Sequence, residues 1–299
     1  MLNPLSWHIE PTSRCTLECP GCDRTWFKKT FKKQIINDID IDDLINFFHV
    51  NKFYNSFISL CGNNGDPIYH PEFKTLIKKL KEQNHILEIH TNGSAKTKKF
   101  WIEICDILTK QDTIIFAIDG LKNSNSQYRI NSNWQQIMDA VEVANKSVAR
   151  TVWKFIVFNH NQTQIKECQT QSQTLGFDEF CLVKSHRWLD ESLQDFLPNE
   201  DYIDKQKIDI MHDIDSNQPL QLFPQCNTNK MIYIDCNGDI YPCCWTGTYR
   251  FKEKNIFGKE KININQGKLA FNHKHQKFLK NAKEWNTAPL VCRLHCAKN

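Results

Sequence analysis

Apolar and polar positions follow two different periods along the first 185 residues of the chain. Six short stretches are apolar or alternate between apolar and polar residues, as strands do, and turn-forming residues bound them. Between them, apolar residues recur at helical spacing, as in Phe73, Leu76, Ile77 and Leu80. The predicted strands lie in residues 5–11, 55–63, 86–93, 112–120, 150–160 and 177–185. The predicted helices lie in residues 38–50, 70–83, 97–110, 133–147 and 161–176.

The alternation of strand and helix predicts the fold class. Strands that alternate with helices form parallel βα units, so we expect an α/β fold with a partial (βα)6 barrel, similar to an incomplete TIM barrel. Such a barrel carries its working groups on the loops after the carboxyl ends of its strands. We also expect Pro71 to occupy the first position of its helix and Gly176 to end another.

The alternation stops near residue 190, which divides the chain into three predicted parts. Residues 1–190 form the core barrel, the polar stretch 191–215 is a linker, and residues 216–299 form a small cysteine-rich domain. This last part contains a predicted β-hairpin over residues 231–245, with Asn237 and Gly238 at the turn, and a helix.

Composition and charge narrow the class of protein. The net charge of +4 over 299 residues is small, which argues against nucleic acid as a partner on electrostatic grounds. The chain begins with no basic segment followed by an apolar core and has no stretch of 18 apolar residues, which predicts a cytoplasmic protein without a membrane partner. In a reducing compartment, thirteen cysteines indicate metal binding or catalysis rather than disulfides.

The first cysteine group follows the first predicted strand. Cys15, Cys19 and Cys22 have the spacing C-x3-C-x2-C, and no fourth cysteine follows before Cys61. Zinc favours four closed ligands, whereas three thiolates suit a [4Fe–4S] cluster with one iron left open. The alternative is that Cys15 pairs with a distant thiol in a closed zinc or cluster site.

This spacing after a first strand resembles the signature of radical S-adenosylmethionine (radical SAM) enzymes. The resemblance implies that S-adenosylmethionine (SAM) binds the open iron and that reduction yields a 5′-deoxyadenosyl radical, which takes a hydrogen atom from the substrate. It also implies an electron donor such as flavodoxin or ferredoxin.

Four further segments resemble this family, in the same order along the chain, and one of them is "HTNG" after the third strand. The segment "NGDP" is a variant of the family's G-G-E-P segment, which contacts the methionine amino group, although Gly-Asp-Pro is also good turn chemistry. "AIDG" has Ala117 where the family often has serine, and its aspartate could approach the cofactor or cap the next turn. On the fifth strand, a lysine and an asparagine are candidates for the methionine carboxylate or the ribose. The implied cofactor-binding residues are Asn64, Gly65, Asp66, Pro67, Asp119, Lys154 and Asn159.

One position departs from the family pattern. The family usually has an aromatic residue beside adenine just before the third cysteine, and this chain has Gly21. We therefore expect other groups to hold adenine, either backbone or an aromatic such as Trp26 or Phe27.

The second cysteine group lies after residue 220. Four thiols from two segments, Cys226 with Cys243 and Cys292 with Cys296, can close a zinc site or hold a second [4Fe–4S] cluster. The C-x(9–15)-G-x4-C pattern resembles the start of a SPASM or twitch extension, which implies an auxiliary [4Fe–4S] cluster. Cys244 competes with Cys243, because adjacent residues of a strand point to opposite faces.

The substrate is not specified by the sequence. Arg187 and Trp188 follow the sixth strand, where a guanidinium and a flat ring could hold a substrate. The resemblance implies hydrogen abstraction from a small molecule such as a cyclitol, or from a peptide or protein. The short stretch before Cys15 favours a small molecule or a substrate delivered by another protein. The alternative function is a non-catalytic iron–sulfur or zinc-binding protein on a degenerate barrel.

Overall fold

The structure is a computed structural model of the 299-residue chain. It describes residues 6–185, 188, 191–203, 221–224, 226, 231–248, 262–266, 277, 280–284, 286, 288 and 290–298. None of the described helices is both long and apolar enough to cross a membrane.

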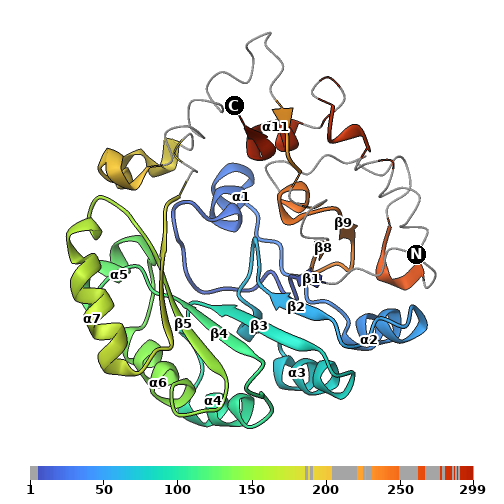
Figure 1. Ribbon diagram of the computed structural model, residues 1–299, viewed down its shortest axis with the longest axis horizontal. Helices are drawn as coiled ribbons and strands as arrows, with labels where there is room; N and C mark the ends of the chain where they lie inside the picture. Colours follow the sequence, from blue (N-terminus) through green and yellow to red (C-terminus); the bar gives the residue numbers. More distant parts are fainter. Residues whose placement is uncertain are drawn as a thin grey trace.

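A curved, mostly parallel sheet forms the centre of the molecule (Figure 1). Its strands run in the order β6-β5-β4-β3-β2-β1-β8-β9, so β1 to β6 follow the chain from the interior of the sheet out to the β6 edge. All six predicted strands are present, and each pairs in parallel with its neighbour, which confirms the α/β class and the barrel-like sheet. These strands are β1 (Ser6–Ile9), β2 (Phe57–Leu60), β3 (Ile86–Thr91), β4 (Thr113–Ala117), β5 (Arg150–Ile156) and β6 (Glu179–Val183).

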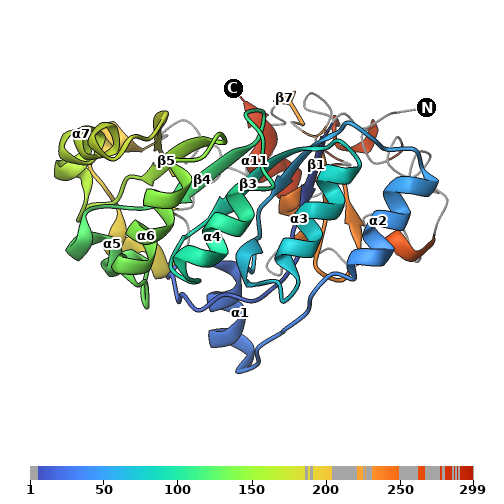
Figure 2. The same ribbon diagram turned by 90° about the horizontal axis from the view of Figure 1, so that it is seen from below.

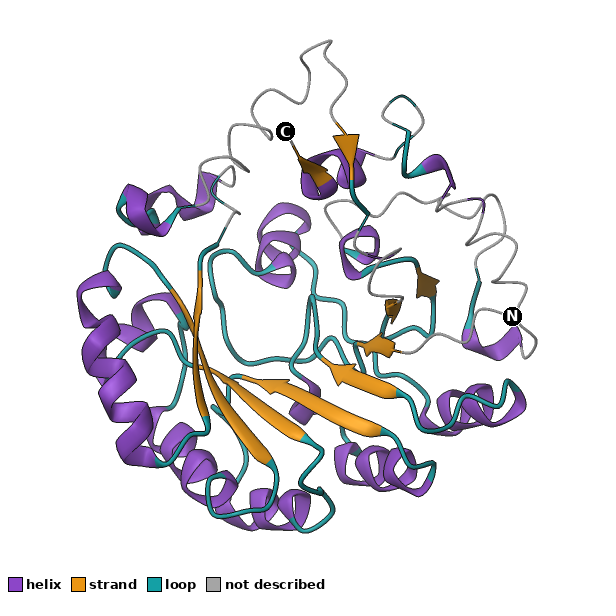
Figure 3. Ribbon diagram, viewed as in Figure 1, coloured by secondary structure: helices purple, strands orange, loops and turns teal. Residues whose placement is uncertain are grey.

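The predicted helices lie along the outer, convex side of this sheet (Figure 3). Each buries one apolar face against the strands, as their spacing predicts. These helices are α2 (Ile41–Val50), α3 (Phe73–Glu82), α4 (Lys98–Cys105), α6 (Trp134–Ala144) and α7 (Ile165–Leu175). Gly176 ends α7 at a positive φ of 86°, as expected, whereas α3 starts at Phe73 and not at Pro71.

Two helices were not expected from the sequence. Helix α1 (Asp23–Phe31) begins directly after Cys22 and projects from one end of the sheet (Figure 2). Helix α5 (Lys122–Tyr128) follows β4 and carries few apolar residues, so its period is invisible in the sequence. Both lie in the connections that follow the carboxyl ends of β1 and β4, where the working loops of such a sheet lie.

The C-terminal hairpin extends the same sheet. Strand β8 (Met231–Ile234) pairs in parallel with β1, with Trp7 opposite Ile232, and in antiparallel with β9 (Ile240–Tyr241). Gly238 lies in the turn at a φ of 75°, as the Asn-Gly pair predicts. The sheet therefore continues across the predicted boundary between the core and the C-terminal part.

Two short elements join the chain's last residues to an earlier segment. Strand β7 (Gln221–Leu222) pairs in antiparallel with β10 (Ala297–Lys298), and helix α11 (Leu290–Cys296) precedes β10. This pairing positions the cysteines of α11 next to the segment that leads to Cys226.

The main hydrophobic core lies between the sheet and the outer helices. Trp7, Trp101 and Trp153 are fully buried there, and Phe48 and Phe73 join them. Because residues alternate across a strand, the intervening positions face the inside of the barrel, where several are polar.

Candidate functional site

A cavity of about 430 Å³ opens at the carboxyl ends of the strands. Its wall is formed by the cysteine loop, the loop after β2, the ends of β3 to β6 and, from the C-terminal part, Trp245. This is the end of the sheet at which the fold class predicts the working groups.

The three cysteines of the first group share this wall. Cys15, Cys19 and Cys22 all line the cavity. Burial raises the pKa of the Cys15 thiol to about 12 and that of Cys19 to about 11. Within the described ranges, no group of three or more His, Cys, Asp or Glu side chains is drawn tightly enough for a single metal ion. Three thiols on one wall fit a [4Fe–4S] cluster, in which each would bind a different iron.

Arg24 ties the cysteine loop to the loop after β2. Its Nε donates to the carbonyl of Asn64 at 2.9 Å, and its terminal nitrogen donates to the carbonyl of Leu17. Because Arg24 is buried and lies two residues after Cys22, it fixes the loop with charge-assisted hydrogen bonds.

A buried carboxylate, that of Glu10, hydrogen-bonds to the backbone of the loop from Asn64 to Pro67. Glu10 accepts hydrogen bonds from the backbone N–H of Asn64 at 2.6 Å and of Gly65 at 2.9 Å. Burial raises the pKa of Glu10 to about 7, although these bonds and one from the Tyr233 hydroxyl favour the charged form. The loop thus depends on Glu10 of the first strand and on Tyr233 of β8.

Three residues of this loop line the cavity. Asn64 is buried, and its Oδ1 has no hydrogen-bond partner among the described residues. Gly65 is required here because a Cβ would lie 1.9 Å from the carbonyl oxygen of Thr12. Asn64, Gly65 and Asp66 line the cavity, whereas Pro67 begins a short 3-10 turn outside its lining.

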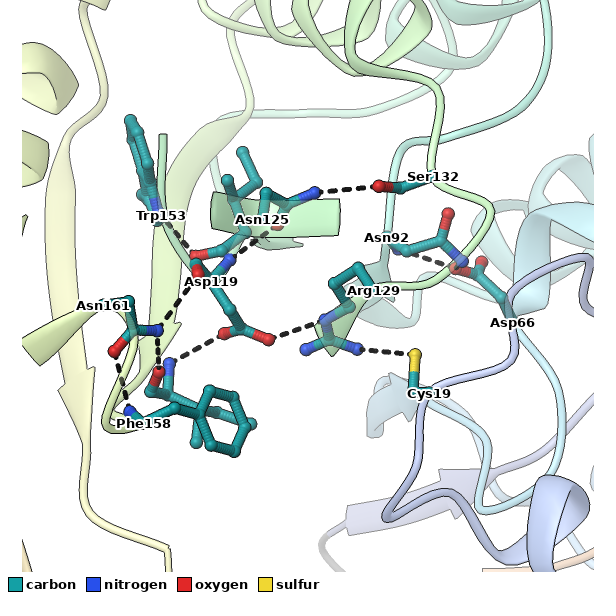
Figure 4. Close-up of polar contacts among 12 residues, drawn as sticks. Cys19, Asp66, Asn92, Asp119, Asn125, Arg129, Ser132, Trp153, Phe158 and Asn161 are labelled. Carbon is teal, nitrogen blue, oxygen red and sulfur yellow. Dashed lines mark hydrogen bonds and ion pairs between the residues drawn. The ribbon is translucent and has the colours of Figure 1, made fainter. Parts of the chain in front are cut away.

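Asp66 is turned toward the end of β3. Its Oδ2 accepts from both the backbone and the side-chain nitrogens of Asn92, at 2.6 Å each (Figure 4). Burial raises the pKa of Asp66 to about 6, although these hydrogen bonds favour the charged carboxylate. The Asn92 amide also lies 3.6 Å from the sulfur of Cys15, so Asp66 and Asn92 connect the loop to the first cysteine.

Asp119 does not line the cavity but holds a residue that does. Its carboxylate is fully buried and accepts from the Nε of Arg129 at 2.6 Å and from the backbone N–H of Ile156 at 2.8 Å (Figure 4). Arg129 lines the cavity, and one of its terminal nitrogens lies 4.0 Å from the sulfur of Cys19. The aspartate therefore orients a guanidinium beside the cysteine loop.

The side chains around Gly21 explain why this position is a glycine. A Cβ there would lie 2.9 Å from the hydroxyl oxygen of Tyr128 and 3.0 Å from Leu193. The ring of Tyr128 packs on that of Phe158, with centroids 4.1 Å apart. Both rings line the cavity, so aromatic surface reaches this wall from other elements.

The remaining candidates for cofactor and substrate lie in different places. Lys154 lines the cavity, but the Nδ2 of Asn159 donates to the carbonyl of Asp195 and Asn159 is not in the lining. Trp188 packs edge-on against Phe158, and its indole N–H donates to Ser185. Arg187 lies outside the described residues. Trp26 and Phe27, considered for adenine, pack against Phe31 on α1 and are also absent from the lining.

The structure brings part of the second cysteine group together. Cys243 lies close enough to Cys296 for the thiols to interact electrostatically, and the carbonyl of Cys296 accepts from the N–H of Phe223 at 2.8 Å. Cys292 precedes Cys296 by one helical turn, and Cys226 follows Phe223 by three residues. The competitor Cys244 contributes its carbonyl to the Nδ2 of Asn63 at 2.9 Å.

Residues 9–166 match the model of the radical SAM superfamily. The chain belongs to the radical SAM superfamily. The match covers just over half of the chain and includes the three cavity cysteines, the loop after β2, Asp119 and Arg129.

Three individual proteins resemble the chain over most of its length. A tungsten-containing aldehyde ferredoxin oxidoreductase cofactor-modifying protein of Pyrococcus furiosus is 23% identical over 275 residues, which are 85% of this chain and 74% of the relative. SuiB of Streptococcus suis bound to S-adenosylmethionine matches with a TM-score of 0.60 and 15% identity, over 88% of this chain. BtrN in complex with AdoMet and 2-DOIA matches with a TM-score of 0.56 and 15% identity, over 98% of this chain and 93% of BtrN. The match spans 64% of SuiB.

Sequence reasoning missed three residues of this candidate site, namely Glu10, Tyr128 and Arg129. A charged residue at the end of a buried strand was the available signal for Glu10. Tyr128 and Arg129 follow a helix without an apolar period, so only the folded chain brings them to Cys19 and Gly21.

Proposed function

We propose that this radical SAM protein is an enzyme that reductively cleaves SAM and abstracts a hydrogen atom from an unidentified substrate. The observation that carries the proposal is that Cys15, Cys19 and Cys22 line one cavity beside an Asn64 oxygen without a partner among the described residues. A [4Fe–4S] cluster with SAM on its open iron would supply the 5′-deoxyadenosyl radical. The residues of this chain bind, orient and shield these groups.

Two polar groups of the cavity fit the methionine end of SAM. Asn64 Oδ1 is an acceptor for the amino group, and Gly65 lets the loop pass close to the cysteine loop. Arg129, oriented by Asp119 and directed at Cys19, fits the carboxylate. Asp66 supports the loop through Asn92, and Pro67 begins the turn that ends it.

The aromatic wall fits adenine. Tyr128 and Leu193 occupy the space that an aromatic residue at position 21 would need, and the rings of Tyr128 and Phe158 line the cavity. A flat base gains favourable contact with such rings. We therefore assign adenine to this wall in place of Trp26 or Phe27.

The C-terminal cysteines fit an auxiliary [4Fe–4S] cluster in a twitch-type extension. Cys226, Cys243, Cys292 and Cys296 come from two segments joined by β7 and β10, and Cys243 lies near Cys296. Such a cluster would exchange electrons with the substrate or with the first cluster, and a flavodoxin or ferredoxin would supply the reductant. A structural zinc ion is the alternative occupant.

The substrate class is proposed from two relatives. SuiB has been crystallised with a precursor peptide, SuiA, and BtrN with 2-DOIA. The match with BtrN covers a larger share of this chain than the match with SuiB, which supports a small molecule as the substrate. A peptide or protein is the second candidate.

An anaerobic reconstitution tests the enzyme proposal. We expect iron and sulfide for about two clusters, and 5′-deoxyadenosine from SAM after reduction. A variant with alanine at Cys15, Cys19 and Cys22 should form no 5′-deoxyadenosine and should keep the iron of the C-terminal site. The matched variant with alanine at the four C-terminal cysteines should still bind SAM.

Three outcomes separate the alternatives. A protein that binds iron but forms no 5′-deoxyadenosine with any reductant is a non-catalytic iron–sulfur protein. Zinc in place of the second set of iron assigns the C-terminal site a structural role. Loss of all iron when only Cys15, Cys19 and Cys22 are replaced contradicts two separate sites.

A further inference from the structure

A second cluster of polar side chains, apart from the cysteine loop, lies on the inner face of the barrel. His8 on β1, Glu88 and His90 on β3, and Lys154 on β5 occupy inward-facing positions, and Cys61 follows β2. Cys61, His90 and Lys154 line the cavity. Among the described residues, none of these five bonds to Arg129 or Asn64, so the group is available to something other than the methionine end of SAM.

Lys154 differs from the other basic residues of the cavity. In the part of the chain that the structure describes, four Lys and Arg side chains line it: Arg24, Arg129, Lys154 and Lys184. Arg24 donates to backbone carbonyls, Arg129 pairs with Asp119, and Lys184 donates to the carbonyl of Asp201 at 2.7 Å. The ammonium of Lys154 makes no hydrogen bond or ion pair with any described residue. It is therefore the cation that remains to bind an anion.

His90 and Glu88 form a hydrogen-bonding pair next to this cation. The Nε2 of His90 lies 2.7 Å from Oε1 of Glu88, which also accepts from the hydroxyl of Ser59 at 3.1 Å. Burial opposes the charge of Glu88, but the bonds from His90 and Ser59 and the charge of Lys154 outweigh it and lower its pKa. The pair is thus held in place by the protein, and the other face of the His90 ring can meet a ligand.

Arg129 and Lys154 interact with groups at different ends of the cavity. Arg129 interacts with Asp119, Cys19 and Asp66, all at the cysteine end. Lys154 interacts electrostatically with His8, Cys61 and Glu88, all of the inner strands. Burial lowers the pKa of His8 to about 4, and its Nε2 donates to the carbonyl of Cys61, so His8 adds no charge near neutral pH. SAM has one carboxylate, and Arg129 already fits it.

We propose that Lys154 and the His90–Glu88 pair form the substrate-binding site, and that the substrate is an anionic small molecule with a hydroxyl group. Its carboxylate or phosphate binds the ammonium of Lys154, and its hydroxyl hydrogen-bonds to His90. The proposal rests on the proposed function, because it takes SAM to fill the cysteine end. It moves Lys154 from the cofactor to the substrate.

The test measures anion binding to the cluster-loaded, SAM-bound protein before any reduction. Inorganic phosphate and malonate are titrated by calorimetry at constant ionic strength. We expect saturable binding of at least one anion, and Lys154→Met should weaken it about tenfold or more, as the loss of one charge-assisted hydrogen bond does. Lys154→Arg should retain most of the binding. Lys184→Met, at the exposed rim of the same cavity, is the matched control and should leave it unchanged.

A second pair of probes tests the hydroxyl contact. Glycerate is compared with propionate, and glycerol 3-phosphate with ethyl phosphate. We expect the hydroxyl-bearing probe of at least one pair to bind severalfold more tightly, and His90→Ala to abolish that difference while keeping the weaker binding. The pair that responds identifies the anion as carboxylate or phosphate.

Three results overturn this proposal. The first is that neither anion binds saturably. The second is that Lys154→Met and Lys184→Met weaken anion binding equally. The third is that Lys154→Met weakens the binding of SAM as strongly as it weakens the binding of the anion. The last result would return Lys154 to the cofactor. Failure of the proposed function itself is distinct, since it appears as wild-type protein that yields no 5′-deoxyadenosine.

Discussion

At the residue scale, the absence of an aromatic side chain at Gly21 is offset by Tyr128. The family pattern has an aromatic at this position, and its absence leaves space that the Tyr128 hydroxyl and Leu193 fill. Tyr128 comes from the end of α5, more than a hundred residues later. The same wall is therefore built from a different part of the chain.

The role of Tyr128 can be tested by two substitutions. Tyr128→Ala should raise the dissociation constant of SAM about tenfold, because the ring would no longer contact adenine. Tyr128→Phe keeps the ring and should remain within about twofold of wild type. Equilibrium binding of SAM to the cluster-loaded protein measures both. Equal losses in the two variants would show that the hydroxyl, and not the ring, matters.

At the element scale, the hairpin of β8 and β9 depends on its turn. Gly238 has a φ of 75°, and a Cβ there would lie 2.7 Å from Ile264. Gly176 at the end of α7 also has a positive φ, but a Cβ there would meet no atom closer than 3.9 Å. An alanine at position 176 would therefore meet only backbone strain, whereas an alanine at position 238 would meet both backbone strain and a steric overlap with Ile264.

This comparison predicts different costs for the same substitution. Gly176→Ala should lower the free energy of unfolding by about 1 kcal/mol, the cost of a left-handed alanine. Gly238→Ala adds the contact with Ile264 and should cost more, and it should also reduce the iron bound at the C-terminal cysteines. Thermal unfolding and iron analysis of the reconstituted variants measure both effects. Equal destabilisation would mean that Ile264 moves aside without cost.

Helices α1 and α5 show why elements near the site are hard to predict. Helix α1 buries the polar residues Asp23, Arg24 and Thr25 of its first turn, whereas its rings Trp26 and Phe27 each contact Phe31 of the same helix. Helix α5 is almost entirely polar. Neither has the apolar period that identified the outer helices, because both face the working end of the sheet and not the core.

At the scale of the whole molecule, the C-terminal part and the cofactor loop are joined through one carboxylate. Strand β8 lies beside β1, which lets the hydroxyl of Tyr233 donate to Glu10, and Glu10 holds Asn64 and Gly65. A change in the hairpin is therefore transmitted to the loop that we assign to SAM.

Two tyrosines of the hairpin test this connection. Tyr233→Phe removes the bond to Glu10, and we expect SAM to bind several times more weakly because the loop loses support. Tyr241→Phe is the matched control, since Tyr241 is also buried and bonds to Asp235 but does not reach Glu10. SAM affinity of the two variants is the measurement. If both weaken SAM alike, the effect is one of general stability.

The sequence by itself determined the six parallel strands, the outer helices, the hairpin turn and the three-cysteine loop. These features are local, because strand and helix periods, the Asn-Gly pair and the cysteine spacing are all written in consecutive residues. Only the tertiary structure decided that β8 continues the sheet beside β1, that Tyr128 fills the space at Gly21, and that Asp119 orients Arg129. These contacts join residues far apart in the chain, and no local pattern specifies which distant side chains a buried carboxylate or a small glycine will meet.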